Sequence, residues 1–219
     1  MTIHHKPIIG IVGGVGSGKS AVARWFAEHC CGSLIDADAV GHQVLLQEEV
    51  KIRLRETFGD DIFAEGEVDR KQLGTLVFGD GPEQTRARRQ LESIVHPAMA
   101  AVFQAELAKA DADDEIRLVI FDAAVLLETG WREQCDVVVF VEVPHDQRVQ
   151  RVAASRGWTE GELARREASQ WSLDRKRQAA DIVVDNSETI EHTGQQLVDT
   201  LVEQGWLTDR RTPCSIGTP

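Results

Sequence analysis

The sequence predicts an α/β fold in which a parallel sheet is flanked by helices. Two observations support this prediction: short apolar segments rich in β-branched residues, and helical patterns that separate them. The five strand candidates occupy 8–12, 33–36, 117–123, 135–143 and 181–186. Apolar strands without polar alternation are typical of sheets buried on both faces, and their alternation with helices favours parallel order.

Helical patterns fill most of the chain between these strands. We expect helices over 21–28, 39–58, 70–78, 82–109, 145–155, 160–180 and 188–204, with a small hairpin in the connector 60–70. The helical region 82–109 should be interrupted at His96–Pro97, because proline disfavours helical geometry in the residue before it. On the residues alone, His96 is a core histidine at this break.

Composition narrows the functional classes. The 219 residues are 42% hydrophobic and 27% charged, and apolar runs such as 137–141 are far shorter than the roughly 20 residues of a membrane span. The net charge of −12 argues against extended binding to nucleic acid, which needs a basic surface. Four cysteines without zinc-like spacing fit a reducing compartment. The start "MTIHHKP" lacks the apolar segment of a secretory signal, so we expect a cytoplasmic protein.

The most specific motif is "GGVGSGKS" at 13–20, which matches G-x-x-x-x-G-K-[ST] between a strand and a helix. Its glycines let successive backbone N–H groups turn toward phosphate oxygens, and the helix that follows adds its positive end. Lys19 can reach the β- and γ-phosphates, and the Ser20 hydroxyl can bind Mg²⁺. The loop therefore indicates a nucleotide site, with a tightly packed glycine turn as the less favoured interpretation.

The residues around the loop favour phosphoryl transfer to an acceptor over a GTPase switch, because no guanine-reading N-K-x-D segment occurs. Asp36 and Asp38 follow the second strand, where the carboxyl edge of a parallel sheet binds ligands. We favour Asp38 as the base for an acceptor hydroxyl and Asp36 as a helix cap. Asp122, at the end of the third strand, could hold Mg²⁺ through water.

Positive charge gathers after the fourth strand, although the chain is acidic overall. Such a cluster can be a solvated helix face, or it can form a lid that neutralises the transferring phosphoryl group. We favour Arg151 and Arg156 as lid residues and leave the other arginines of the cluster open. The cluster consists of arginines 148, 151, 156, 165, 166, 175 and 177 with Lys176.

Several segments together resemble the dephospho-coenzyme A kinase family, in family order from about Ile8 to about Gln204. They are "GGVGSGKS", "IDADAVGHQV", "DRKQLGTLVF", "LESIVHP", "VLLETG" and "ASQWSLDRKRQAADIVVDN". The resemblance implies a P-loop NTPase-type sheet of five parallel strands, with core segments 8–38, 116–145 and 181–204. It also implies a helical acceptor-binding region over about 39–115 and a lid over about 146–180, before a tail, 205–219, that we expect to be disordered.

The implied reaction is transfer of the γ-phosphate of ATP to the ribose 3′-hydroxyl of dephospho-coenzyme A, the last step of coenzyme A synthesis, with Mg²⁺. Its partners would be these two small molecules, with no nucleic acid and no membrane, and the sequence does not indicate an oligomeric state. When the family's functional residues are transferred to matching positions of this chain, Asp38 matches the catalytic base. Lys19 and Arg151 would assist it in catalysis. The residues expected to bind the acceptor are His96, Leu127 and Glu128. The ATP residues are Gly14, Val15, Gly16, Ser17, Gly18, Lys19, Ser20, Ala21, Arg151 and Arg156.

The chain departs from the family pattern at three positions. Ala21 replaces the usual threonine, Ala124 replaces a proline before "LLE", and Ser155 stands where the second lid arginine is expected. Arg156 is one residue further on, which rotates a helical side chain by about 100°. Two alternatives stay open: another small-molecule kinase on the same scaffold, such as a nucleoside or nucleoside monophosphate kinase, and a nucleotide-binding regulatory protein without transfer.

Overall fold

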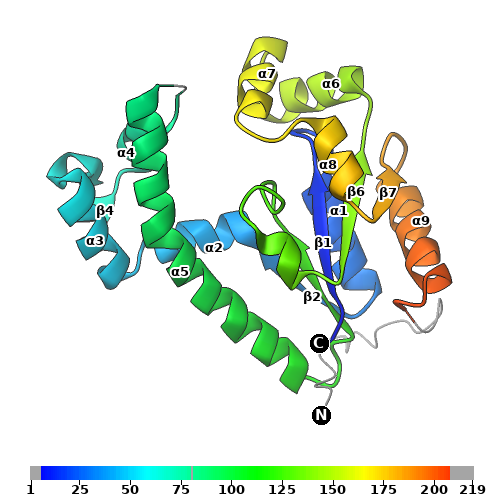
Figure 1. The fold of residues 1–219 in the computed structure, drawn as a ribbon. Helices are drawn as coiled ribbons and strands as arrows, with labels where there is room; N and C mark the ends of the chain where they lie inside the picture. Colours follow the sequence, from blue (N-terminus) through cyan, green and yellow to red (C-terminus); the bar gives the residue numbers. More distant parts are fainter. Residues whose placement is uncertain (1–5, 80, 208–219) are drawn as a thin grey trace. The chain divides into compact units, whose positions relative to one another are not determined.

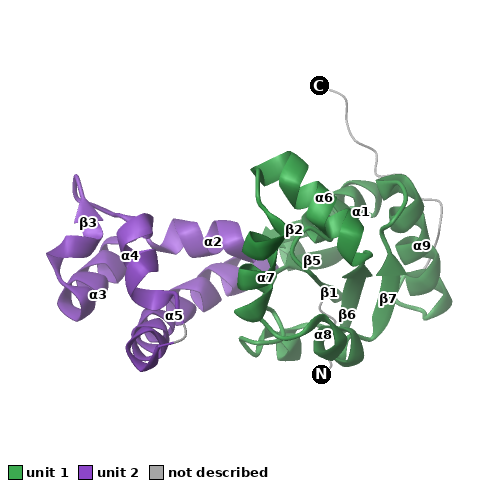
Figure 2. Cartoon of the chain, turned by 90° about the horizontal axis from the view of Figure 1, so that it is seen from above, with its two compact units in different colours: residues 1–36, 108–219 green, residues 37–107 purple. Residues whose placement is uncertain are grey.

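The computed structural model describes residues 6–79 and 81–207 and divides the chain into two compact units. Unit 1 consists of residues 1–36 and 108–219, and unit 2 consists of residues 37–107 (Figure 2). The tail expected from 205 onward lies outside the described residues from 208 to 219. Its first three residues are described, and Leu207 packs against the hydrophobic core.

Unit 1 is built on a parallel sheet in the order β2-β5-β1-β6-β7 (Figure 1). The strands are β1 (Ile8–Gly13), β2 (Gly32–Asp36), β5 (Leu118–Asp122), β6 (Val137–Glu142) and β7 (Ile182–Asp185). All five coincide with the predicted segments, and β1 lies in the middle, paired with β5 and β6. The predicted α/β class with five parallel strands is confirmed.

Helices and loops bury both faces of this sheet. On one face, α1 (Lys19–His29) and α9 (Ile190–Glu203) form one core with alternate strand residues, among them Ile9, Ile11 and Val139. On the other face, a side chain at Gly10 would lie 2.9 Å from Cys135 Sγ and Leu126 Cδ1, so the residues after β5 pack directly on β1. The remaining helices of the unit are α6 (His145–Arg156), α7 (Glu160–Ala168) and α8 (Leu173–Ala179), with a short η2 (Trp131–Gln134).

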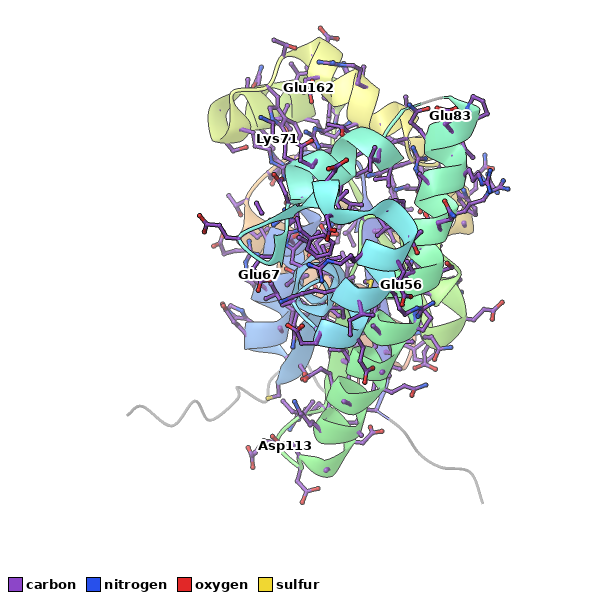
Figure 3. All side chains as sticks on the ribbon, turned by 90° about the vertical axis from the view of Figure 1, so that its left-hand side faces the viewer. Glu56, Glu67, Lys71, Glu83, Asp113 and Glu162 are labelled. Atoms are coloured by element: carbon purple, nitrogen blue, oxygen red, sulfur yellow. The ribbon has the colours of Figure 1, made fainter. Side chains whose placement is uncertain are left out.

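Unit 2 is mainly helical. Its elements are α2 (Ala37–Val44), α3 (Glu48–Phe58), η1 (Asp60–Ile62), the hairpin β3 (Phe63–Ala64) with β4 (Glu67–Val68), and α4 (Arg70–Val77). Residues of α5 (Pro82–Ala112) up to 107 complete it. Buried Lys51 joins the hairpin to α3 by binding Glu48 at 2.9 Å and Glu67 at 2.7 Å. Figure 3 labels Glu67 and Glu56, whose side chains both belong to the exposed surface of this unit.

The predicted interruption at His96–Pro97 is wrong, because α5 is 31 residues long and continues through Pro97 without a break. Proline has no N–H for the carbonyl four residues earlier, which here belongs to Ser93. Arg53 of α3 approaches that carbonyl oxygen with Nη2 at 3.5 Å. A side-chain donor thus compensates for the missing backbone donor, which sequence rules do not anticipate.

Two further helical predictions merge elements that the structure separates. The region 39–58 forms α2 and α3, divided at 45–47, and the region 160–180 forms α7 and α8, divided at 169–172. In the second case Ser172 begins α8 by accepting a hydrogen bond from the Arg175 N–H at 3.3 Å. A polar cap inside a helical pattern therefore marks the new helix.

Candidate active site

The loop between β1 and α1 has the backbone geometry that its glycines predict. Gly16 and Gly18 adopt φ angles of 79° and 81°, in the left-handed region that favours glycine. Inside the loop, the Ser17 N–H donates to the Gly14 carbonyl at 3.1 Å. Gly18 directly precedes α1 and offers no side-chain cap, so the first amides of the helix remain available to an anion.

Lys19 lies at the carboxyl edge of the sheet beside an acidic strand end. Its Nζ atom donates to Asp122 Oδ1 at 2.5 Å and to Ser20 Oγ at 3.2 Å. Asp122 is the last residue of β5 and pairs in register with Asp36, the last residue of β2. The edge thus combines a loop built for anions, a cation and two strand-end carboxylates.

The oxygen atoms at this edge suit a hard cation. Ser20 Oγ and Asp122 Oδ1 both contact the Lys19 ammonium group, so a hydroxyl and a carboxylate lie close to one another. Mg²⁺ prefers such oxygen ligands and usually keeps waters and phosphate oxygens in its shell. The residues that the structure describes include no group of three or more His, Cys, Asp or Glu side chains able to hold a metal.

The outward carbonyls of the loop are bound by side chains from other elements. Arg151 of α6 donates from Nη1 to the Ser17 carbonyl at 3.3 Å and from Nη2 to the Asn186 carbonyl at 2.8 Å. Asn186, which directly follows β7 and is buried, donates from Nδ2 to the same Ser17 carbonyl at 2.7 Å. A side chain at Gly18 would lie 2.7 Å from Asn186 Nδ2, which is a second reason for glycine there.

Arg148, one helical turn before Arg151, is a buried member of the same arrangement. Its Nη1 donates to the Val15 carbonyl at 3.4 Å and to Glu167 of α7, and its Nη2 lies 3.3 Å from His145 Nδ1. From the sequence, the role of Arg148 within the positive cluster stayed undecided, and Asn186 was not identified as a site residue. The "DN" ending of the last strand was the only signal for Asn186, and it carried no indication of a contact with the loop.

Arg156 lies away from the contacts that Arg151 makes. Its guanidinium group stacks on the Trp158 ring at 4.6 Å, and Arg166 stacks on the same ring at 4.0 Å. Arg166 also pairs with Glu162 at 3.2 Å, a residue that Figure 3 labels on α7. Arg156, one residue beyond the family's second lid arginine, thus stacks on Trp158 and does not contact the phosphate loop as Arg151 does.

Leu127 and Glu128 lie in the loop after β5. Leu127 is buried. Glu128 Oε1 accepts from the Trp171 N–H at 2.9 Å and pairs with Lys176 Nζ at 3.0 Å. The structure therefore brings these predicted acceptor residues into unit 1 together with the phosphate loop, although they are distant in sequence.

Asp38 and His96 belong to unit 2. Asp38 is exposed in the first turn of α2, two residues after the end of β2, and His96 is half-buried in α5. A side chain at Gly41 would lie 3.7 Å from the Met99 methyl group, so α2 packs on α5. Asp38 and His96 each precede one residue of this contact by three positions, which is about one helical turn.

Unpartnered polar atoms also gather around the loop. In the described part of the chain, three buried side-chain atoms have no hydrogen-bond partner: Ser17 Oγ, Glu128 Oε2 and Arg148 Nε. Buried polar groups are nearly always paired, and exceptions concentrate at functional sites. Ser17 belongs to the loop, Arg148 contacts the loop at the Val15 carbonyl, and Glu128 belongs to the segment after β5.

The sheet order, the glycine loop and the lysine at its end define the class: the chain has the fold of the P-loop kinases. A dephospho-CoA kinase from Campylobacter jejuni has this fold, with a TM-score of 0.57 at 20% identity over 93% of this chain and 99% of that one. A shikimate kinase from Acinetobacter baumannii shares it with a TM-score of 0.53 at 16% identity, over 91% of this chain and 94% of the other.

Within this class the chain belongs to the dephospho-CoA kinase family, whose pattern matches residues 7–192. Dephospho-CoA kinases from Rhodopirellula baltica and Thermobifida fusca are 42% and 38% identical, over 84% and 90% of this chain and 85% and 94% of theirs. The crystal structure of TT1252 from Thermus thermophilus gives a TM-score of 0.75 at 31% identity, over 91% of this chain and 98% of that one. The family resemblance and the kinase class predicted from the sequence are confirmed. No helix in the described residues is long and apolar enough to cross a membrane.

Proposed function

We propose that the chain transfers the γ-phosphoryl group of ATP to the ribose 3′-hydroxyl of dephospho-coenzyme A and so forms coenzyme A and ADP. One observation carries the donor half of this proposal: the phosphate loop presents Lys19 beside Asp122 at the carboxyl edge of the sheet. The acceptor half follows from membership of the dephospho-CoA kinase family. The expected cytoplasmic location stays a prediction.

On the donor side, the loop amides and Lys19 would hold the ATP phosphates. The Lys19 side chain is 13% exposed and its partner Asp122 is 3% exposed, so this cation is held where water screens it little. The Ser17 and Ala21 amides already donate to the Gly14 and Gly18 carbonyls, so the other amides between Gly14 and Ser20 would surround the phosphates. Ser20, with Asp122 acting through water, would hold Mg²⁺. When bound, Mg²⁺ supplies positive charge to the transferring group.

On the acceptor side, we assign Asp38 to the orientation and deprotonation of the attacking hydroxyl. It is exposed at the start of a helix, so its carboxylate is free to meet a ligand. His96, Leu127 and Glu128 would bind the rest of the acceptor, within an acceptor region over about 39–115 and the loop after β5. Positioning and charge stabilisation account for most of the catalysis in such transfers.

In the proposed lid, over about 146–180, Arg151 has a role that its contacts suggest. Because it donates to the Ser17 and Asn186 carbonyls, it would keep the loop amides pointed at the phosphates as well as add charge. Arg156, stacked on Trp158, would contribute less to ATP binding.

The proposal is tested by ADP formation with Mg²⁺ and ATP, in the absence and presence of acceptors. We expect ADP to form rapidly with dephospho-coenzyme A and at no more than a few per cent of that rate with adenosine, AMP or pantetheine 4′-phosphate. Lys19→Ala serves as the blank. Fast turnover with AMP or adenosine would indicate another kinase of this scaffold, and ATP binding without acceptor-dependent turnover would indicate a regulatory protein.

A further inference from the structure

Lys176 is a fully buried cation whose three N–H donors all have acceptors. Its Nζ atom donates to the Ala124 carbonyl at 2.6 Å and to Gln170 Oε1 at 2.8 Å, and it pairs with Glu128 Oε1 at 3.0 Å. A buried charge is retained only when its partners compensate for the lost water. The set is complete, so the position of Lys176 determines the positions of its acceptors.

These acceptors come from two segments that are far apart in the sequence. Ala124 and Glu128 belong to the loop after β5, while Gln170 precedes α8 and Lys176 lies within it. Glu128 belongs to the "VLLETG" motif, which Ala124 directly precedes, and Gln170 and Lys176 belong to the "ASQWSLDRKRQAADIVVDN" motif. The ammonium group is where the two motifs meet.

The same helix also contacts the phosphate loop. A side chain at Gly14 would lie 3.0 Å from Leu173 Cδ2, and Leu173 precedes Lys176 by three residues on the same helical face. Burial lowers the pKa of Lys176, and the positive charge of Lys19 lowers it further, whereas Glu128 and Glu167 act in the opposite direction. The charged groups around Lys176 are thus Lys19 from α1, Glu128 from the loop after β5 and Glu167 from α7.

One atom of this arrangement remains without a partner. Glu128 Oε2 is buried and accepts no hydrogen bond from any described residue, while Oε1 is occupied by Lys176 and the Trp171 N–H. A carboxylate fixed through one oxygen presents the other in a defined direction. That oxygen can accept a hydrogen bond from a hydroxyl or N–H donor of a ligand.

We propose that Lys176 is a positioning residue of the transfer site, which fixes the Glu128 carboxylate so that its second oxygen binds a hydroxyl or N–H group of the acceptor. This inference rests on the proposed function, because it takes Glu128 as part of the acceptor site. Lys176 itself touches neither substrate. It acts through Glu128 and through the loop that runs from Asp122, the partner of Lys19.

The test compares Lys176→Met, Glu128→Gln and the double variant with the wild type, using Arg177→Gln as a control. Arg177 is the next residue on α8, and its pair with Glu142 is exposed, so its loss should change little. For each variant the measurements are kcat, KM for dephospho-coenzyme A, the dissociation constant for ATP without acceptor, and the melting temperature.

We expect Lys176→Met to raise KM for dephospho-coenzyme A by at least about tenfold and to change the ATP dissociation constant by less than about threefold. The double variant should match Glu128→Gln, because residues that act as a unit are not additive. An unchanged acceptor KM would overturn the proposal. So would additive losses, or a loss of ATP affinity in parallel with the melting temperature, which indicates a structural role only.

If Lys176→Met does not fold, Gln170→Ala tests the proposal instead. It removes one of the three acceptors of Lys176 and keeps the Lys176–Glu128 ion pair. It should raise the acceptor KM with the ATP dissociation constant unchanged, and an unchanged acceptor KM would again overturn the proposal. Turnover of dephospho-coenzyme A by the wild type tests the proposed function separately. A failure there is therefore distinct from a failure of the role of Lys176.

Discussion

At the scale of single residues, the phosphate site is defined by what each charged group already binds. Lys19 binds Asp122, and Arg151 binds carbonyls of the loop itself and of Asn186. These contacts orient the cations before a nucleotide arrives, which reduces the reorganisation that binding and transfer require. The roles that we propose for Asp38 and Arg151 can be separated, because loss of Asp38 should lower kcat and loss of Arg151 should weaken ATP binding.

We expect Asp38→Asn to lower kcat by at least about 100-fold, because an amide cannot accept the proton of the attacking hydroxyl. The ATP dissociation constant should stay within about twofold, since Asp38 belongs to a helix after β2 and not to the phosphate loop. Steady-state kinetics and an ATP titration measure both quantities. A fall in ATP affinity with kcat preserved would assign Asp38 to the nucleotide instead.

The two arginines on α6 should differ in their effect on ATP binding. Arg151→Met removes two donors to backbone carbonyls at the phosphate loop and at Asn186, so we expect KM for ATP to rise by about tenfold or more. Arg156→Met removes a partly exposed stacking contact and should change KM for ATP by less than about threefold. Equal effects, or the reverse order, would contradict these assignments.

Burial should make two thiols unreactive in the folded chain. Desolvation raises the pKa of Cys30 to about 11 and that of Cys135 to about 12, so both stay protonated well above neutral pH. At pH 8 we expect iodoacetamide to leave both unmodified in the native protein and to modify both in urea. Peptide mapping by mass spectrometry distinguishes them, and rapid native alkylation would contradict the raised pKa of half-buried Cys30 or of buried Cys135.

At this scale the sequence predicts the loop residues well and their partners poorly. The motif assigns Lys19 and Ser20 because the chemistry of phosphate binding lies in adjacent residues. Asn186 and Lys176 reach the site from segments more than a hundred residues away. Their side-chain contacts depend on the sheet order, which no local pattern contains.

At the scale of elements, the packing of α1 against α9 depends on one close contact. A methyl group at Gly194 of α9 would lie 2.1 Å from the Trp25 ring of α1, so the two helices can approach only with glycine there. The strands and most helices were predictable from apolar periodicity, whereas this contact was not. The continuous α5 shows the same limit, since the contact of Arg53 with the Ser93 carbonyl lies outside the helix that contains Pro97.

We expect Gly194→Ala to lower the free energy of unfolding by about 1–3 kcal/mol through overpacking against Trp25. The matched control is Gly161→Ala in α7, where the nearest atom, Thr159 Oγ1, is 3.9 Å from the added methyl group. That change should be neutral or stabilise by up to about 1 kcal/mol, because alanine favours helix. Urea denaturation measures both, and equal stability of the two variants would refute the α1–α9 contact.

At the scale of the whole molecule, ligand binding should stabilise the fold by mass action. ATP at about 100 times its dissociation constant adds about 2.7 kcal/mol, which for a chain of this size corresponds to a shift of about 5–10 °C in Tm. Thermal melting with ATP and Mg²⁺ measures this shift. We expect Lys19→Ala to lose most of it, and a full shift in that variant would place the nucleotide away from the phosphate loop.

The measurement that tests the central claim most directly is mass spectrometry of the products formed from ATP, Mg²⁺ and dephospho-coenzyme A. Adenosine, AMP and pantetheine 4′-phosphate are present as competing acceptors, and Lys19→Ala provides the blank. We predict that dephospho-coenzyme A alone gains one phosphate, on the ribose 3′-oxygen, and that the blank shows none. A phosphate on a different acceptor, or on no acceptor while ATP binds, would contradict the account.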